Sequence, residues 1–316
     1  MKRFLLGFAL ALLAACGDDE SSFAPRDDEP TSSSWSSEGT IGSSSSVKSS
    51  SSVASSSSVK SSSSAKSSSS AKSSSSVSSS SEYVPFDHSK TLGWQKLDGG
   101  YKTFTDSRNG RSYYYITITG RDTADNVASV TVMAENLNVG ADVPGDQDQN
   151  DDTKIERYCY NNDTTKCDEF GGLYQWAEMM QLPSECNTKS CADQIKPNHQ
   201  GICPDGWRLL TYDDFFIILH SDANESGIKG LRSTFGFGGN NESGYSLVGA
   251  GYNWNYTFLS LTEGTYWFYP EESDENPKKG VGSYTYDSAT TVERKGFYLK
   301  KHGFSVRCVM VENQAE

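Results

Sequence analysis

Several aromatic side chains in the last third of the sequence stand next to amide and carboxylate groups. Asn253, Asn255 and Glu263 lie among these rings. Sugar rings present C–H patches that stack on flat aromatic faces, while their hydroxyls bond to nearby polar groups. The pattern predicts a carbohydrate-binding surface, and the alternative is that the rings fill a core poor in aliphatic side chains. The candidate ligand-binding residues are Trp254, Tyr256, Trp267 and Tyr269.

A second stretch that could do chemistry is acidic. Residues 142–152 contain five aspartates and the spacing Asp-x-Asp-x-Asn, and calcium prefers clustered oxygen ligands of this kind. The EF-hand pattern does not fit, because Arg157 stands at position 12 of a loop that would begin at Asp146. The alternative is a solvated acidic loop. The candidate ligands of a structural calcium ion are Asp146, Asp148, Asn150 and Asp152.

The cysteines predict disulfide bonds. The sequence has seven, and six remain if Cys16 is set aside. An even number in an exported domain favours disulfides, and six cysteines allow 15 pairings. Short spacing favours Cys159–Cys167 and Cys186–Cys191, which would leave Cys203–Cys308 as a long bridge. A metal site is the rival interpretation, but no Cys-x-x-Cys pair exists and the four histidines are scattered.

The start of the chain resembles a bacterial lipoprotein export signal. Two basic residues precede an apolar run of ten residues, which is too short to span a bilayer of about 30 Å. Two alanines then precede Cys16, as in a lipobox whose cysteine is acylated. We therefore predict a signal peptide over residues 1–15 and a lipid on Cys16; the alternative is an ordinary secretory signal. Gly17 after the cysteine favours sorting to the outer membrane.

Residues 16–82 are typical of a flexible tether. From Ser43 the sequence repeats six-residue units such as SSSSVK, and units with one small apolar side chain cannot bury a core. A random coil of about 66 residues has a root-mean-square reach of roughly 45 Å. We predict a lipid-anchored, serine-rich, disordered linker over 16–82, with glycosylation of the serines as an open alternative. The globular domain is predicted over 83–316.

Charge excludes some partners. The chain has a formal net charge of -13, and residues 83–316 hold 21 basic and 33 acidic side chains. The predicted domain therefore carries most of the negative charge. A basic footprint for phosphates is missing, so we expect no nucleic-acid partner. We also expect no adsorption to anionic lipid apart from the anchor on Cys16.

The elements that must position these residues are short. Aromatic and β-branched runs predict strands, and Asn109-Gly110 is a hairpin signal. Apolar residues at helical spacing, and a capping signal at Thr211, predict two main helices. The predicted fold class is α+β: a disulfide-braced, loop-rich domain of short antiparallel strands with two main helices. The predicted strands are 113–119, 127–133 and 304–311, and the predicted helices are 171–180 and 211–219.

Four segments, in the same order, resemble one family. They read MAENLN at 133–138, CYNND followed by a cysteine and GGLYQWA within 159–177, QGICPDGWRL at 200–209, and GFSVRCV at 303–309. These segments are similar to the marks of the Fibrobacter succinogenes major paralogous domain, and the resemblance covers roughly residues 94–312. Two departures stand out. Leu210 replaces the usual proline, and residues 264–271 read GTYWFYPE where the family has a GYWWSSTE-like segment.

The resemblance implies a C-type-lectin-like fold, related also to formylglycine-generating-enzyme-like domains, and attachment to a bacterial surface. The preferred interpretation is a lipid-anchored, surface-exposed, non-catalytic module of the outer membrane that binds extracellular polysaccharide or a surface protein. The alternative is an extracellular enzyme, either carbohydrate-active or modifying proteins as formylglycine-generating enzymes do. No nucleophile-elbow motif is present and no carboxylate pair can be located, so we name no catalytic residue.

The lipid anchor generates the first testable prediction. Cys16→Ser removes the thiol that would be acylated, so the variant should leave the membrane fraction after cell lysis, whereas the unaltered chain should sediment with membranes. Fractionation with a salt wash, followed by immunoblotting, measures this difference. A Cys16→Ser variant that still sediments with membranes would contradict the lipoprotein interpretation.

Overall fold

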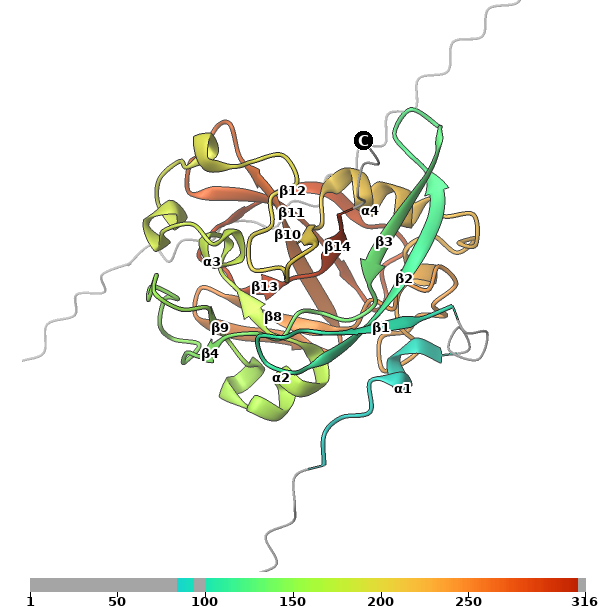
Figure 1. Cartoon of the computed structure of the whole chain (residues 1–316), viewed down its shortest axis with the longest axis horizontal. Helices are drawn as coiled ribbons and strands as arrows, with labels where there is room; N and C mark the ends of the chain where they lie inside the picture. The colour runs from blue at the N-terminus through green and yellow to red at the C-terminus, as the bar shows by residue number, and fades with distance from the viewer. Residues whose placement is uncertain (1–83, 94–99, 312–316) are drawn as a thin grey trace, which may run out of the picture. The chain divides into compact units, whose positions relative to one another are not determined.

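The computed structural model describes residues 84–93 and 100–311 (Figure 1). The predicted signal peptide over 1–15, the lipidation site Cys16 and the predicted linker over 16–82 lie outside the described residues. Among the helices of the described part, none has the length and apolar character needed to cross a membrane.

A five-stranded antiparallel sheet has the strand order β1-β2-β3-β14-β7. The strands predicted over 113–119 and 127–133 are confirmed as β2 and β3, which Figure 1 shows as a long curved hairpin, and the predicted Asn109-Gly110 turn joins β1 to β2. The buried Ile118 of β2 alternates with exposed threonines, and Thr117 pairs with Thr131 through their hydroxyls at 2.8 Å. The strands are β1 (Lys102–Thr105), β2 (Ser112–Arg121), β3 (Val127–Met133), β7 (Trp207–Leu209) and β14 (Cys308–Met310).

Helix α4 (Tyr212–Leu219) begins where the capping signal at Thr211 predicted a helix start. It packs on the β2–β3 hairpin. The Thr211 hydroxyl accepts from the backbone N–H of Asp214, and the Asp214 carboxylate accepts from the N–H of Thr211, which satisfies two N–H groups of the first turn. Gly120 of β2 allows the close approach, because a Cβ there would lie 2.4 Å from the carbonyl oxygen of Ile217.

The second sheet is mixed, which corrects the prediction of antiparallel strands alone. Its order is β12-β11-β10-β13-β6, with β8 beside β10 and β9 beside β8. Strand β10 runs parallel to both β13 and β8. The strands are β6 (Leu173–Tyr174), β8 (Ala250–Trp254), β9 (Thr257–Leu261), β10 (Gly264–Glu272), β11 (Lys279–Tyr286), β12 (Glu293–Leu299) and β13 (Phe304–Ser305).

Two predicted elements are wrong in part. The first half of the helix predicted over 171–180 is strand β6, and only its end forms helix α3 (Trp176–Met180). Sheet pairing overrides the helical spacing, because β6 pairs with β13. The strand predicted over 304–311 divides into β13 and β14, because the chain passes there from one sheet to the other.

The remaining elements are short. Helix α2 (Thr164–Phe170) was not predicted, although Asp163 caps it by accepting from the N–H of Thr165. The others are α1 (Ser89–Leu92), α5 (Ile228–Leu231), the 3₁₀ helices η2 (Tyr160–Asn162), η3 (Ser184–Asn187) and η4 (Ala192–Gln194), and the parallel pair β4 (Ala141–Asp142) and β5 (Glu156–Arg157).

Three disulfide bonds brace the described domain: Cys159–Cys167 and Cys186–Cys191, which short spacing favoured, and Cys203–Cys308, the long bridge that those two pairs leave. The third closes a sequence separation of 105 residues, whereas the second closes only five. All six cysteines are buried.

The long bridge generates the second prediction. Replacing both Cys203 and Cys308 by alanine should lower the free energy of unfolding by about 4–5 kcal/mol, because the loop-closure entropy of the unfolded chain rises with loop length. The same replacement of Cys186 and Cys191 should cost about 2 kcal/mol. Urea unfolding of both double variants measures the difference, and equal losses would contradict the loop-length argument.

Candidate ligand-binding site

The β8–β9 hairpin carries the most exposed of the predicted ligand-binding residues. Trp254 pairs with Thr257, which leaves Asn255 and Tyr256 as a two-residue turn. Both turn residues have positive φ, 47° and 64°, as a type I′ turn requires. The turn places the Tyr256 ring at the surface, where 40% of the residue is exposed.

A network of hydrogen bonds holds the Tyr256 side chain in place. Its hydroxyl donates to Asp148 Oδ1 at 2.9 Å, and Lys301 Nζ lies 2.7 Å from Asp148 Oδ2. Gln175 Nε2 donates to the same Asp148 Oδ1 at 2.9 Å and to the carbonyl of Lys301 at 2.9 Å. Asp148 thus joins the hairpin, the start of α3 and the turn after β12, so the tyrosine ring is held before any ligand arrives.

The electrostatics of the network keep Asp148 ionised. Burial pushes the pKa of Asp148 upward, but the hydrogen bonds from Gln175, Lys301 and Tyr256 outweigh burial and hold the pKa below its usual value. The negative charge of the Asp148 carboxylate and the positive charge of the Lys301 ammonium offset each other. The site therefore offers polar groups next to an aromatic ring without a large local net charge.

The second aromatic side chain of the site, Trp254, lies on a buried histidine. Its ring stacks on His302 with centroids 3.9 Å apart and an interplanar angle of 17°. His302 is 1% exposed, and burial lowers its pKa to about 3, so the ring is neutral at ordinary pH. His302 Nδ1 accepts from the N–H of Asn255 at 3.3 Å, which supports the turn that presents Tyr256.

A buried lysine anchors the turn that supplies Lys301 and His302. Lys300 Nζ lies 2.6 Å from Glu272 Oε1 and 4.2 Å from the centre of the Trp176 ring. Lys300 is 0% exposed, so the charge pair and the ring together replace its water shell. Sequence analysis did not single out residues 300–302, and their only local signal is a run of polar residues before the final glycine-phenylalanine motif.

Two of the predicted ligand-binding residues, Trp267 and Tyr269, are buried in the core. Both residues lie on β10, the central strand of the second sheet, and are 4% and 1% exposed. Trp267 Nε1 donates to the Tyr269 hydroxyl, which also pairs with Ser283 at 2.8 Å. Strands on both sides of β10 and helix α4 over its face bury these rings, so they stabilise the core and cannot stack on a sugar.

The four predicted calcium ligands do not converge. Asp148 is bound to Lys301, and Asp152 Oδ1 accepts from the N–H of Ser184 at 2.8 Å. Asp146 and Asn150 are exposed. Within residues 84–93 and 100–311, the one group of three metal-ligating side chains combines Asp142 with Cys159 and Cys167, whose sulfurs are joined in a disulfide. The geometry therefore does not support the predicted calcium site.

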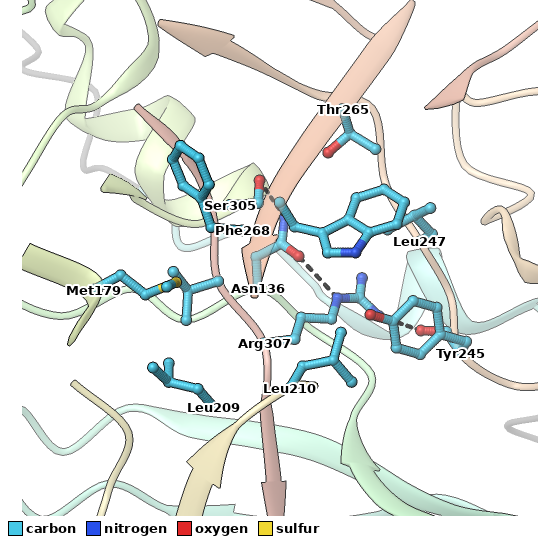
Figure 2. Close-up of a pocket in the computed structure, with 12 residues that line it drawn as sticks. Asn136, Met179, Leu209, Leu210, Tyr245, Leu247, Thr265, Phe268, Ser305 and Arg307 are labelled. Atoms are coloured by element: carbon cyan, nitrogen blue, oxygen red, sulfur yellow. Dashed lines mark hydrogen bonds between the residues drawn. The ribbon is translucent and has the colours of Figure 1, made fainter. Parts of the chain in front are cut away.

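The interior holds a cavity of about 10 Å³ (Figure 2), which has room for one water at most. Trp267 and Phe268 line it together with Thr265, so the segment that departs from the family pattern faces the core rather than a ligand. Arg307 reaches across the cavity to Asn136 and Tyr245, as Figure 2 shows. The surface around Tyr256 is thus the better candidate for binding.

Comparison with known proteins identifies a family. The family model described as the Fibrobacter succinogenes major domain matches residues 126–310, more than half of the chain. The match includes the three disulfides and Trp254, Tyr256 and His302, but begins after β2. It confirms the family resemblance of the sequence motifs. No curated protein matches the chain, and no solved structure does.

The buried histidine generates the third prediction. Because the pKa of His302 falls from 6.5 to about 3 on folding, only the unfolded chain binds its proton between these pH values. This contribution to stability is fully present above pH 6.5 and is lost as the pH falls, by roughly 3 kcal/mol at pH 4. Urea unfolding at pH 7 and pH 4 should therefore show a smaller acid loss for His302→Gln than for the unaltered chain. Equal losses would contradict the neutral, buried histidine.

Proposed function

The chain belongs to the Fibrobacter succinogenes major domain family, and we propose that its domain is a non-catalytic module that binds polysaccharide through Tyr256 and Trp254. The observation that carries the proposal is the Tyr256 ring, 40% exposed on a type I′ turn and bonded to Asp148. An aromatic ring that is already fixed loses little conformational entropy when a ligand binds.

The polar groups of the site suit the hydroxyls of a sugar. Asp148 has free acceptor capacity, and Lys301 is 39% exposed in its side chain, so both can bond to hydroxyls beside the ring. Trp254, which is half-buried and precedes the same turn, is the second aromatic residue of the proposed surface. A sugar that stacks on the ring and bonds to these groups at its edge uses both kinds of contact.

The proposal includes the place of the module. A lipid on Cys16 and the serine-rich linker over 16–82 would hold the domain clear of the outer membrane, where it meets extracellular polymers. We also propose, from the family resemblance, that the fold is C-type-lectin-like. If the chain is retained on none of the polysaccharides tested, a surface protein becomes the favoured ligand.

The enzyme alternative receives less support from the described residues. Chemistry of the formylglycine-generating kind needs a reactive cysteine thiol, and all six cysteines of the described part are paired in disulfides. The structure thus favours binding over protein modification.

The binding surface generates the fourth prediction. Tyr256→Ala should reduce retention of the purified chain on insoluble polysaccharide by about 5- to 150-fold, if one ring contributes about 1–3 kcal/mol as in base stacking on aromatics. Because the ring lies at the surface, its removal should leave the melting temperature nearly unchanged. Sedimentation with cellulose, xylan and pectin measures retention, and calorimetry measures melting.

Two variants control the experiment. Phe297→Ala removes another exposed ring, 54% exposed on β12 and outside the site, and should leave retention unchanged. Trp267→Ala removes a core ring and should lower stability by about 3–5 kcal/mol. If Tyr256→Ala and the unaltered chain are retained equally, the proposed binding surface is wrong.

A further inference from the structure

A cleft on another part of the domain has mixed walls and is independent of the Tyr256 surface. It has a volume of about 410 Å³ and lies between the loop before β5 and the end of α3. Its lining combines the apolar side chains of Ile155, Leu182 and Pro183 with polar ones, namely Asp152, Thr153, Lys154, Glu178 and Gln181. A volume of this size is typical of sites for small ligands or single side chains.

The distinctive group of the cleft is the carboxyl group of Glu178. The residue is 8% exposed and lines the cleft. Its Oε1 accepts from the N–H of Glu156 at 3.1 Å and lies 3.4 Å from Gln181 Nε2. No donor among the described residues bonds to the other oxygen, Oε2, and this atom is not enclosed. One oxygen of a largely buried carboxyl group is therefore left for a ligand in the cleft.

The surroundings of Glu178 favour a cation. Burial is the main cause that raises the pKa of Glu178 to about 7; the carboxylates of Glu156, Asp152 and Asp151 add to this effect, and the N–H of Glu156 opposes it. Tyr174 of β6 also faces Glu178 and is buried with a raised pKa, so it stays neutral. Lys154 is the one basic side chain of the cleft lining, and it pairs with Asp151 at 3.0 Å and with Glu156 at 3.4 Å. The cleft thus keeps an excess of negative charge.

We propose that this cleft binds the side chain of a lysine from a partner peptide. The methylene groups of that lysine would pack on Ile155, Leu182 and Pro183, and its ammonium would donate to Glu178 Oε2 and Asp152. An alkylammonium matches a site whose lining offers both apolar side chains and carboxylates. A sugar hydroxyl or a carboxylate would leave the negative charge of the site uncompensated.

Binding should be coupled to the release of a proton. Since Glu178 is about half protonated near pH 7, an ammonium must displace that proton in order to pair with the carboxylate. The affinity should therefore be about tenfold weaker at pH 6 than at pH 8, because Glu178 is mostly neutral at the lower pH. Hydrogen bonds from Thr153 and Lys154 lower the pKa of Asp151 to about 2, so this carboxylate is ionised at both pH values and does not contribute to the change.

The test uses the whole chain and the probe Nα-acetyl-lysine methylamide, followed by NMR titration at pH 6 and pH 8. The expected result is binding that is about tenfold tighter at pH 8, and no binding of the probe acetylated on its ε-nitrogen. Glu178→Gln should bind weakly and equally at both pH values. Asp152→Asn, which can still accept from Ser184, should weaken binding severalfold and keep the pH dependence.

Glu185→Gln is the matched control, because it removes the same charge from a neighbouring glutamate whose side chain is 61% exposed on η3. It should bind like the unaltered chain. Equal binding of the ε-acetylated probe, or an unchanged pH dependence in a folded Glu178→Gln variant, would overturn the proposal. These variants should be retained on polysaccharide like the unaltered chain. A negative result for lysine binding at the cleft can therefore be distinguished from a negative result for polysaccharide binding at the Tyr256 surface.

Discussion

A buried guanidinium holds the two sheets together. Arg307 lies between β13 and β14, where the chain leaves one sheet for the other, and is 4% exposed. It donates to Asn136 Oδ1 and to the carbonyl of Ser246, each at 2.8 Å, and lies 4.3 Å from the Tyr245 ring. Its partners are an amide and backbone carbonyls rather than a carboxylate. A buried charge is tolerated only when its donors are satisfied, so these segments must adopt one arrangement.

The Tyr256 surface depends on that arrangement, because the residues before β13 supply half of it. Lys300 points inward to Glu272, whereas the next residue, Lys301, points outward to Asp148. The acidic loop is placed from the other side, since Gln149 exchanges hydrogen bonds with Gln175 and binds the carbonyl of Leu173. We propose a different role for the stretch that was predicted to bind calcium. It supplies an acceptor to the aromatic surface at Asp148 and an anionic wall to the cleft farther along.

Local interactions decided how much could be predicted from the sequence. The Asn109-Gly110 turn between β1 and β2 and the start of α4 at Thr211 depend on residues close in sequence, so both were predicted. The two tryptophans, by contrast, stand in similar aromatic strands. Trp254 ends a strand in a surface hairpin, whereas Trp267 lies on a strand with neighbours on both sides. Strand order is set by contacts between distant segments, and no spacing of residues within either strand reports it.

The two proposed sites differ in local charge, and this difference determines which ligands each should accept. The domain is acidic as a whole, but the Asp148–Lys301 pair leaves the surface around Tyr256 compensated, whereas carboxylates outnumber the single lysine of the Glu178 cleft. Fields from surface charges decay over about 8 Å at physiological salt, so each site is governed by its own neighbours. A neutral sugar meets no electrostatic penalty when it approaches the compensated surface. An acidic polysaccharide finds no net electrostatic attraction there and is repelled by the negative charge of the rest of the domain. An alkylammonium, in turn, is attracted to the cleft and gives up its water shell only where carboxylate oxygens replace it.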